Sequence, residues 1–130
     1  MKALLPPGWP RPKGYSNAIS ARGRIIVTAG LVGWDAQERF VAADLDGQFR
    51  QILENLRLVL AEDGAGPEHI VRMTWYVTDK REYLAAGREI GQSFREIIGS
   101  YNAAMTAVEV TALIEDRAKV EIEATAVIPD

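Results

Sequence analysis

Two strand-like runs near the C-terminal end constrain the fold most. Residues 105–111 read MTAVEVT, and residues 117–128 read RAKVEIEATAVI. Successive side chains of a β-strand point to opposite faces, so this alternation of apolar and polar residues predicts a half-buried sheet. The short polar segment at residues 114–116 predicts a β-hairpin that joins the two runs.

Position parity assigns the side chains of these runs to two faces. We expect one face to be core, and its members are Val108, Val110, Val120, Ile122, Ala124 and Ala126. The opposite parity carries the carboxylates and hydroxyls, and its members are Ala107, Glu109, Thr111, Lys119, Glu121, Glu123 and Thr125. Any chemistry of the chain is therefore expected on this second face.

Composition bounds the class of protein. A chain of 130 residues has the size of one domain, and 48% hydrophobic with 25% charged residues is typical of globular proteins. The lack of cysteine excludes disulfides and thiolate chemistry, and fits a reducing compartment. A net charge of −3 disfavours nucleic acid as a partner. No apolar run approaches the roughly 20 residues of a membrane span, so we expect a cytoplasmic protein that binds neither nucleic acid nor membrane.

Residues 15–104 predict an alternation of strands and helices. Strands are expected at 24–30 and 70–78, with a further short strand at 15–19. A helix over 44–62 would bury one stripe: Phe49, Ile52, Leu53, Leu56, Val59 and Leu60. A second helix over 80–98 would bury Tyr83, Gly87, Ile90, Phe94 and Ile97, and Gly99-Ser100 would end it.

This order predicts a single α+β domain over residues 1–130, with a mixed sheet of five to six strands and two helices packed on one face. Two helices cannot cover both faces of such a sheet. The expected uncovered face holds Ile26, Thr28, Thr74, Tyr76, Ala107, Glu109, Glu121 and Glu123. It is too apolar to remain exposed, so we expect self-association that places the carboxylates near a subunit boundary.

Few residues are candidates for catalysis. The only histidine, His69, has no triad or metal-ligand spacing, and no nucleotide-binding glycine motif is present. Glu109, Glu121 and Glu123 remain, and a half-buried carboxylate can act as a general acid or base toward water. Alternatively, these glutamates form cross-strand ion pairs with Arg72, Lys119 or Arg24.

Six segments together carry a resemblance to a known family. They are 14–19 (GYSNAI), 27–30 (VTAG), the 49–60 helix, 76–79 (YVTD), 108–110 (VEV) and 119–126 (KVEIEATA). The chain resembles the Rid/YjgF family of reactive-intermediate deaminases, historically also labelled endoribonuclease L-PSP. The resemblance implies a homotrimer of a chorismate-mutase-like fold with clefts between subunits. It also implies hydrolysis of amino-acid-derived enamines and imines to ammonia and a 2-keto acid, without a cofactor.

The resemblance assigns site residues one by one. Glu121 matches the glutamate that positions or activates water, Tyr15 the pocket tyrosine, and Gly30 the glycine that borders the ligand. The family arginine that grips the substrate carboxylate is missing; its position falls on Ala104 or Met105, and a family asparagine falls at Gly87. The expected catalytic residue is Glu121, and the expected substrate-binding residues are Tyr15, Gly30, Leu31, Gly87, Ala104, Met105, Thr106 and Ala107.

The missing arginine shapes the functional expectation. If Met105 lies beside Glu121, the glutamate lacks a positive partner, and an anionic ligand would meet an unpaired charge. We therefore expect the cleft to reject simple 2-keto acids and to prefer uncharged or amine-bearing ligands. Three functions stay open: a divergent cofactor-independent imine or enamine hydrolase, a non-catalytic ligand-binding or regulatory trimer, and, less favoured because of the acidic charge, a ribonuclease.

Overall fold

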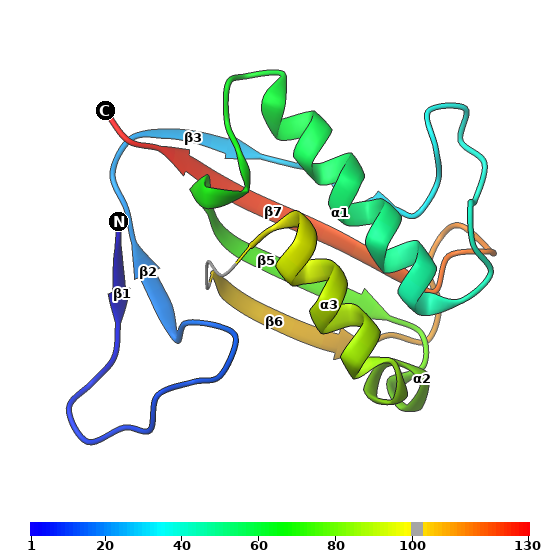
Figure 1. The fold of residues 1–130 in the computed structure, drawn as a ribbon, viewed down its shortest axis with the longest axis horizontal. Helices are drawn as coiled ribbons and strands as arrows, with labels where there is room; N and C mark the ends of the chain where they lie inside the picture. Colours follow the sequence, from blue (N-terminus) through cyan, green and yellow to red (C-terminus); the bar gives the residue numbers. More distant parts are fainter. Residues whose placement is uncertain (100–102) are drawn as a thin grey trace.

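The computed structural model describes residues 1–99 and 103–130. Its strands are β1 (Lys2–Leu4), β2 (Ala18–Ser20), β3 (Arg24–Val27), β4 (Leu31–Val32), β5 (Ile70–Val77), β6 (Ala104–Glu109) and β7 (Val120–Ile128). Its helices are α1 (Leu45–Ala61), α2 (Lys80–Ala85) and α3 (Gly87–Ile97), with a short 3₁₀ turn at Pro67–His69. The grey segment in Figure 1 marks residues 100–102, which lie outside this description.

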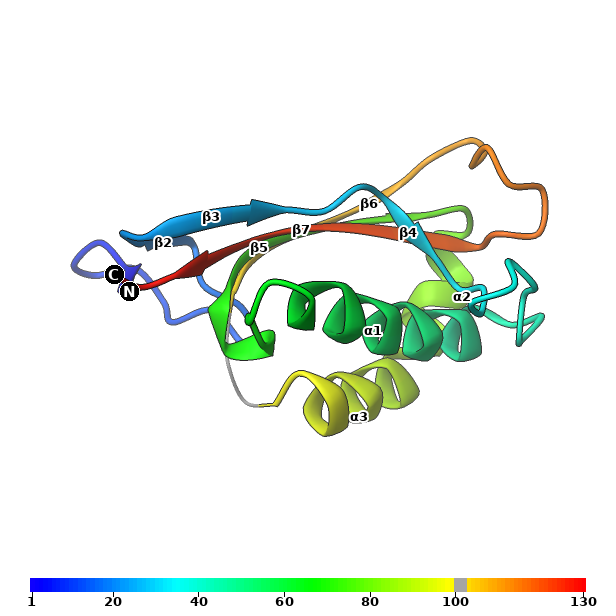
Figure 2. The same ribbon diagram turned by 90° about the horizontal axis from the view of Figure 1, so that it is seen from above.

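In the described part of the chain, the main sheet has five strands. Its order is β3-β7-β5-β6, and β4 pairs with β7 beside β3. The β5–β6 pair is parallel and the other pairs are antiparallel, so the sheet is mixed. Figure 2 shows α1 and α3 on the same side of the sheet, which leaves the other side without helices. This confirms the expected α+β architecture.

The expected hairpin between the last two strands is wrong. β5 lies between β6 and β7 and pairs with both of them. The chain leaves β5 through α2 and α3 and returns as β6 parallel to it, as parallel neighbours require a long crossover. β6 is therefore at the edge of the sheet, and residues 110–119 pass the end of β5 to reach β7 (Figure 1).

The parity assignment holds for β7 and fails for β6. Val120, Ile122, Ala124 and Ala126 are buried, as expected. Val108, however, pairs with Tyr76 on the uncovered face and is 41% exposed. Ala107 and Glu109 pair with Trp75 and Val77 on the helix-covered face, because β6 follows the register of β5 and not that of β7.

Two further residues depart from their expected places. Glu109 accepts a hydrogen bond from the Lys80 backbone N–H at 2.8 Å, at the start of α2. Ile26 pairs with Ala126 and packs against the core, so Ile25 and Val27 occupy the uncovered face in its place. Both are largely exposed, at 68% and 72%. The uncovered face is thus more apolar at β3 than expected.

The first helix follows its predicted stripe closely. Leu45, Phe49, Ile52, Leu53, Leu56 and Leu60 are buried, whereas Val59 is 43% exposed and does not belong to the stripe. Figure 1 shows α1 lying along β7. This helix supplies most of the side chains that cover the sheet.

The second predicted helix is divided in two. Asp79 starts α2 by accepting hydrogen bonds from the backbone N–H groups of Arg81 and Glu82. Ala86 leaves the helical conformation with φ −91° and ψ 12°, and α3 starts at Gly87, a poor helix former. Gly99, with a φ of +99°, follows the end of α3, as predicted; Ser100 lies outside the described residues.

The N-terminal region also differs from its prediction. The short strand is Ala18–Ser20, and it pairs with β1 in a separate two-stranded sheet. β4 was not predicted, because two residues between glycines carry no periodicity. Its residues Leu31 and Val32 pair with Ile122 and Glu121 of β7.

Gln48 ties α1 to the segment that precedes β7. Its side chain is 1% exposed. Nε2 donates to the carbonyl groups of Ala42 and Arg117 at 3.1 and 2.9 Å, and Oε1 accepts from the Lys119 N–H at 2.8 Å. One buried amide thus satisfies three backbone groups, which fixes the start of β7 against the helix layer.

We predict that Gln48→Leu lowers the free energy of unfolding by about 2–4 kcal/mol, because it leaves these backbone groups without partners in a buried place. Urea unfolding followed by circular dichroism measures the loss. Gln92→Leu is the matched control, since the exposed Gln92 bonds only to Glu96; its effect should stay within about 0.5 kcal/mol. Equal losses of stability in the two variants would contradict a stabilising role of the buried Gln48 hydrogen bonds.

Candidate functional site

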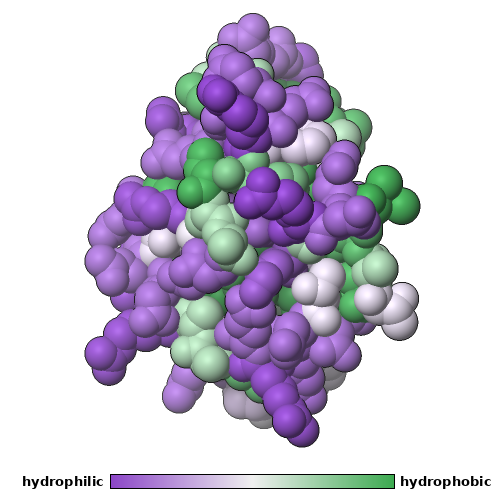
Figure 3. Space-filling view, turned by 90° about the vertical axis from the view of Figure 1, so that its right-hand side faces the viewer, coloured by the Kyte–Doolittle hydropathy of each residue, from purple (hydrophilic) through white to green (hydrophobic). Residues whose placement is uncertain are grey.

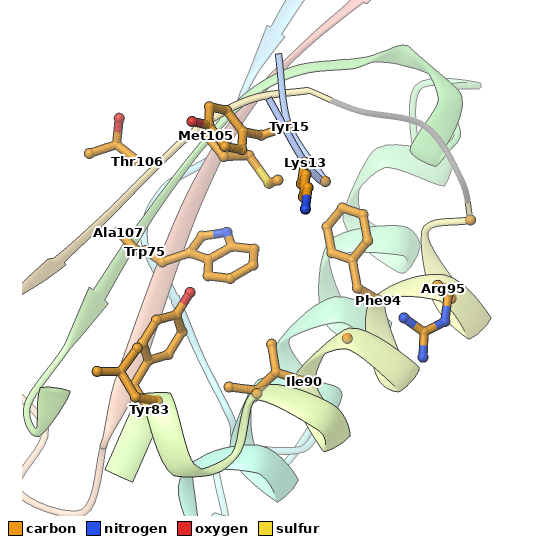
Figure 4. A pocket seen from close by; sticks show the side chains of 15 residues that line it. Lys13, Tyr15, Trp75, Tyr83, Ile90, Phe94, Arg95, Met105, Thr106 and Ala107 are labelled. Carbon is orange, nitrogen blue, oxygen red and sulfur yellow. The ribbon is translucent and has the colours of Figure 1, made fainter. Parts of the chain in front are cut away.

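A cavity of about 690 Å³ lies between the edge of the sheet and helices α2 and α3. Its walls come from residues 13–15, the β5 residue Trp75, helices α2 and α3, and β6. Figure 4 shows these elements surrounding the space, with side chains from both layers pointing into it. A cavity of this size fits a small organic molecule.

The cavity exists because the inner stripe of α3 is incompletely filled. Gly87 and Gly91 stand four residues apart on that stripe and both line the cavity. An added Cβ at Gly87 would meet nothing within 4 Å. Apolar side chains form the remaining wall, among them Ile90, Phe94 and Met105. The hollow is therefore built into the helix sequence.

Aromatic rings give the cavity a fixed wall. The Trp75 ring contacts Phe49 edge-on at a centroid distance of 4.9 Å, and lies 6.2 Å from both Tyr83 and Phe94. Such clusters hold their rings in one arrangement. Burial raises the pKa of the Tyr83 phenol above its ordinary value, so the group stays neutral at physiological pH. The wall is thus apolar with one neutral hydroxyl.

The charged residues that line the cavity are both cationic. Lys13 comes from the N-terminal segment and Arg95 from α3, and no carboxylate lines the cavity within residues 1–99 and 103–130. The environment therefore favours a ligand with an apolar body and a negative or electron-rich group.

Five of the eight expected substrate-binding residues meet in this cavity. Tyr15, Gly87, Met105, Thr106 and Ala107 line it. Ala104 does not; it starts β6 opposite Arg72 and forms a bridge with Ser16. Of the two positions considered for the missing arginine, the one that lines the cavity is Met105.

The other expected site residues lie elsewhere. Glu121 pairs with Tyr76 of β5 and Val32 of β4 and is absent from the cavity lining. It lies against Gly30, where an added Cβ would collide with its Oε2. Leu31, next in β4, is partly buried against the core. Glu121 and Gly30 thus lie against each other, outside the cavity lining.

Met105 and Glu121 lie on opposite faces of the sheet within one chain. Met105 pairs with Met73 on the helix-covered face, whereas Glu121 pairs with Tyr76 on the opposite face. The cavity that Met105 lines does not lack a cation, because Lys13 and Arg95 line it too. The expected reason for this cavity to reject 2-keto acids is therefore absent.

The three candidate glutamates have different surroundings. Glu109 caps α2, and Glu123 Oε1 accepts a hydrogen bond from the Tyr76 hydroxyl at 2.6 Å. This bond to a carboxylate raises the pKa of Tyr76 above its ordinary value. Of the three, Glu121 alone has neither a side-chain hydrogen bond nor an ion pair among the described residues, so its carboxylate is not engaged within the single chain.

Among the described residues, the alternative of cross-strand ion pairs is wrong for all three cations. Lys119 Nζ pairs instead with Glu82 at 3.0 Å, Arg24 pairs with Asp63, and Arg72 forms no ion pair with any of the three glutamates. His69 has a structural role, as its Nδ1 accepts a hydrogen bond from the Gly66 N–H at 3.0 Å. In the described ranges, no three acidic or histidine side chains are arranged to hold a metal ion.

Sequence reasoning missed the residues that give the cavity its character. Trp75, Tyr83 and Phe94 were assigned to core faces, where such residues usually belong. The Gly87–Gly91 spacing was a usable signal, since two glycines four apart leave a gap on one helix face. Nothing local to Lys13 indicates that its segment reaches α3.

The cavity is a candidate small-molecule site on an α+β chain with a mixed sheet, and comparison with known families gives the class of protein. The family model described as Endoribonuclease L-PSP matches residues 10–128. The chain belongs to this family, the Rid/YjgF family, and has its chorismate-mutase-like fold.

Two relatives show the range of assigned roles. A RutC family protein, slr0709 of Synechocystis, is 35% identical over 132 residues, which cover 99% of this chain and 98% of the relative. The 2-iminobutanoate/2-iminopropanoate deaminase of Salmonella typhimurium is 32% identical over 105 residues, which cover 81% and 80%. Family members therefore include an imine deaminase.

Solved structures agree with the fold. The Rid family protein YyfB from Yersinia pestis superposes with a TM-score of 0.84 at 34% identity, covering 98% of both chains. TdcF of E. coli with bound serine gives a TM-score of 0.71 at 28% identity, covering 98% of this chain and 99% of the other. A Rid family structure therefore holds a small amino acid as ligand.

The surroundings of the cavity differ from the end of the molecule formed by residues 33–44 and 110–119. Figure 3 shows that end as predominantly hydrophilic, with apolar residues scattered over it. Ile114 and Val41 are exposed in these segments, and isolated apolar residues are ordinary at protein surfaces. None of the described helices has the length and apolar character needed to cross a membrane.

We predict that Gly30→Ala and Gly33→Ala have different consequences. At Gly30 the new methyl group meets the end of the flexible Glu121 side chain, so the carboxylate moves and the free energy of unfolding changes by less than about 1 kcal/mol. At Gly33 the methyl group would lie 2.7 Å from Gln48 Cα in the backbone of α1, which costs about 2 kcal/mol or more.

Urea unfolding of both variants measures this difference. Since alanine is introduced in both cases, the change in side-chain size is matched. A Gly30→Ala variant as unstable as Gly33→Ala would show that Glu121 is held rigidly over Gly30.

Proposed function

We propose that the chain is a cytoplasmic, cofactor-independent hydrolase of imines or enamines, acting as a deaminase, and that the cavity binds its substrate. The observation that carries this proposal is the convergence of Tyr15, Gly87, Met105, Thr106 and Ala107 around one apolar cavity. Similarity to an imine deaminase over four-fifths of the chain supports the reaction class. The serine bound to TdcF supports an amino-acid-derived ligand.

The reaction consumes one water and releases one ammonia. Water adds to the imine carbon as its proton passes to a base, and the imine nitrogen gains a proton to give a carbinolamine. Collapse of the carbinolamine forms the C=O bond, breaks the C–N bond and releases ammonia. Glu121 is the proposed base, which takes the proton from water and returns it to the leaving nitrogen.

This chemistry requires Glu121 to reach a bound substrate, and one chain alone does not bring it there. We propose a homotrimer in which the Glu121–Gly30 face of one subunit closes the cavity of the next. A head-to-tail contact of this kind forms a closed ring when the rotation is threefold. The exposed Ile25, Val27 and Val108 on the uncovered sheet face support such burial, and the edge strand β6 lies beside the cavity.

A non-catalytic ligand-binding trimer is the second candidate. The observation in its favour is the absence of Glu121 from the cavity lining of the single chain. The two candidates differ in one measurement, since both bind ligand but only the first releases ammonia faster than water alone.

We predict that the protein accelerates hydrolysis of 2-imino acids made in place by an amino-acid oxidase acting on leucine. Competition with semicarbazide, which traps the imine, measures the rate. Glu121→Gln should lower kcat/KM by about 100-fold or more, because it removes the base. Glu123→Gln is the matched control on the same strand and should stay within about threefold. Saturable binding without acceleration would favour the non-catalytic candidate.

We predict that Val27→Lys weakens the trimer, because it places a charge on the face expected to be buried between subunits. Sedimentation equilibrium at micromolar concentration should give a trimer for the wild type and smaller species for the variant. Val41→Lys adds the same charge at a residue that is 53% exposed in the hydrophilic end, and should remain trimeric. A monomeric wild type would overturn the proposed assembly.

A further inference from the structure

Trp75 carries a polar atom that the chain itself does not use. The residue is only 7% exposed, and its indole Nε1–H has no hydrogen-bond partner among the described residues. The group can only donate, so no rotation or change of protonation satisfies it. Buried donors of this kind are rare in folded proteins and call for an explanation.

The unpartnered donor belongs to the cavity wall. Trp75 lines the cavity, and Figure 4 shows the nitrogen-bearing edge of its ring turned toward the side where Lys13, Tyr15 and Met105 lie. Contacts with Phe49, Tyr83 and Phe94 fix the ring in this orientation. The N–H is thus aimed in one direction before any ligand arrives.

Lys13 adds a positive charge on the same side. It lines the cavity, its ammonium group points into the space in Figure 4, and no described carboxylate forms an ion pair with it. Its segment joins the cavity wall through the neighbouring residues: the Ser16 N–H donates to the Ala103 carbonyl at 3.0 Å, at the start of β6. A mobile ammonium and a fixed N–H donor together suit a carboxylate, whose two oxygens accept both.

We infer that Trp75 Nε1–H and Lys13 Nζ bind the carboxylate of the substrate, and that the substrate is a 2-imino acid with a large apolar side chain. The apolar part would pack against Ile90, Phe94 and the open space beside Gly87, where an added Cβ would meet nothing within 4 Å. This inference rests on the proposed function and specifies its substrate class. In this arrangement the positive charge comes from Lys13, which lies outside β6, because Met105 is uncharged.

The ligand reaches Trp75 by a small rearrangement. The nitrogen is shielded from water in the unliganded chain, so a side chain beside it moves on binding. Met105 lies next to the ring in Figure 4 and is unbranched with several rotatable bonds, which makes it the side chain best able to move.

Calorimetry with three probes tests the inference. The stable 2-keto acid 4-methyl-2-oxopentanoate represents the proposed class, pyruvate lacks the apolar body, and 4-methyl-2-pentanone lacks the carboxylate. We expect the wild type to bind the first probe about tenfold or more tightly than either of the others, given the apolar area and the charge-assisted bonds at stake.

The variants separate the two proposed contacts. Lys13→Gln and Trp75→Phe should each weaken binding of 4-methyl-2-oxopentanoate by about fivefold to tenfold and leave binding of the ketone unchanged. Lys80→Gln removes the same charge from a lysine that does not line the cavity, and should bind like the wild type. Lys13 is exposed, so its variant folds even if Trp75→Phe does not.

Two results overturn the inference: equal affinity of the wild type for the keto acid and the ketone, or unchanged keto-acid binding in Lys13→Gln. Failure of the proposed function looks different. In that case the binding pattern holds, but the protein does not accelerate imine hydrolysis, and the carboxylate site stands as a property of a non-catalytic binder.

Discussion

The pairing of β5 with both β6 and β7 is the constraint on which the rest of the structure depends. As an inner strand, β5 presents alternate side chains to two different environments. Trp75 faces the helices and forms the cavity wall, while the next residue, Tyr76, faces the uncovered side and donates to Glu123. One step along this strand therefore separates the apolar cavity from the carboxylates of β7.

The edge position of β6 follows from the same pairing and explains why the cavity is open. Gly87 and Gly91 of α3 face the cavity that β6 borders, and they contribute no side chains to fill it. A longer residue at Gly87 would project into open space, since an added Cβ there would meet nothing within 4 Å. The helix is therefore not fully packed against the sheet at its edge. Unfilled space at a sheet edge can admit a ligand or a second subunit.

The sequence was sufficient for whatever depends on local periodicity. The spacing of apolar residues alone predicts strands β5 and β7 and helix α1. It also predicts which face of β7 is buried, from Val120 to Ala126. The partner of β6 does not, because a short polar segment permits either a hairpin or a crossing over the end of another strand. Once β5 is the partner, the face of every β6 residue is reversed. This single topological fact moves Glu109 and Met105 away from Glu121.

The positive charge at the cavity shows how the arrangement of elements in space affects function. A binding site requires a cation at a place in space, and several segments of a fold can reach that place. Here the β6 position carries Met105, while Lys13 arrives from an N-terminal segment joined to β6 by the Ser16–Ala103 bond. A residue-by-residue comparison registers only the loss at Met105. Lys13 lines the same cavity as Met105, so the loss of one motif residue does not by itself remove positive charge from the cavity.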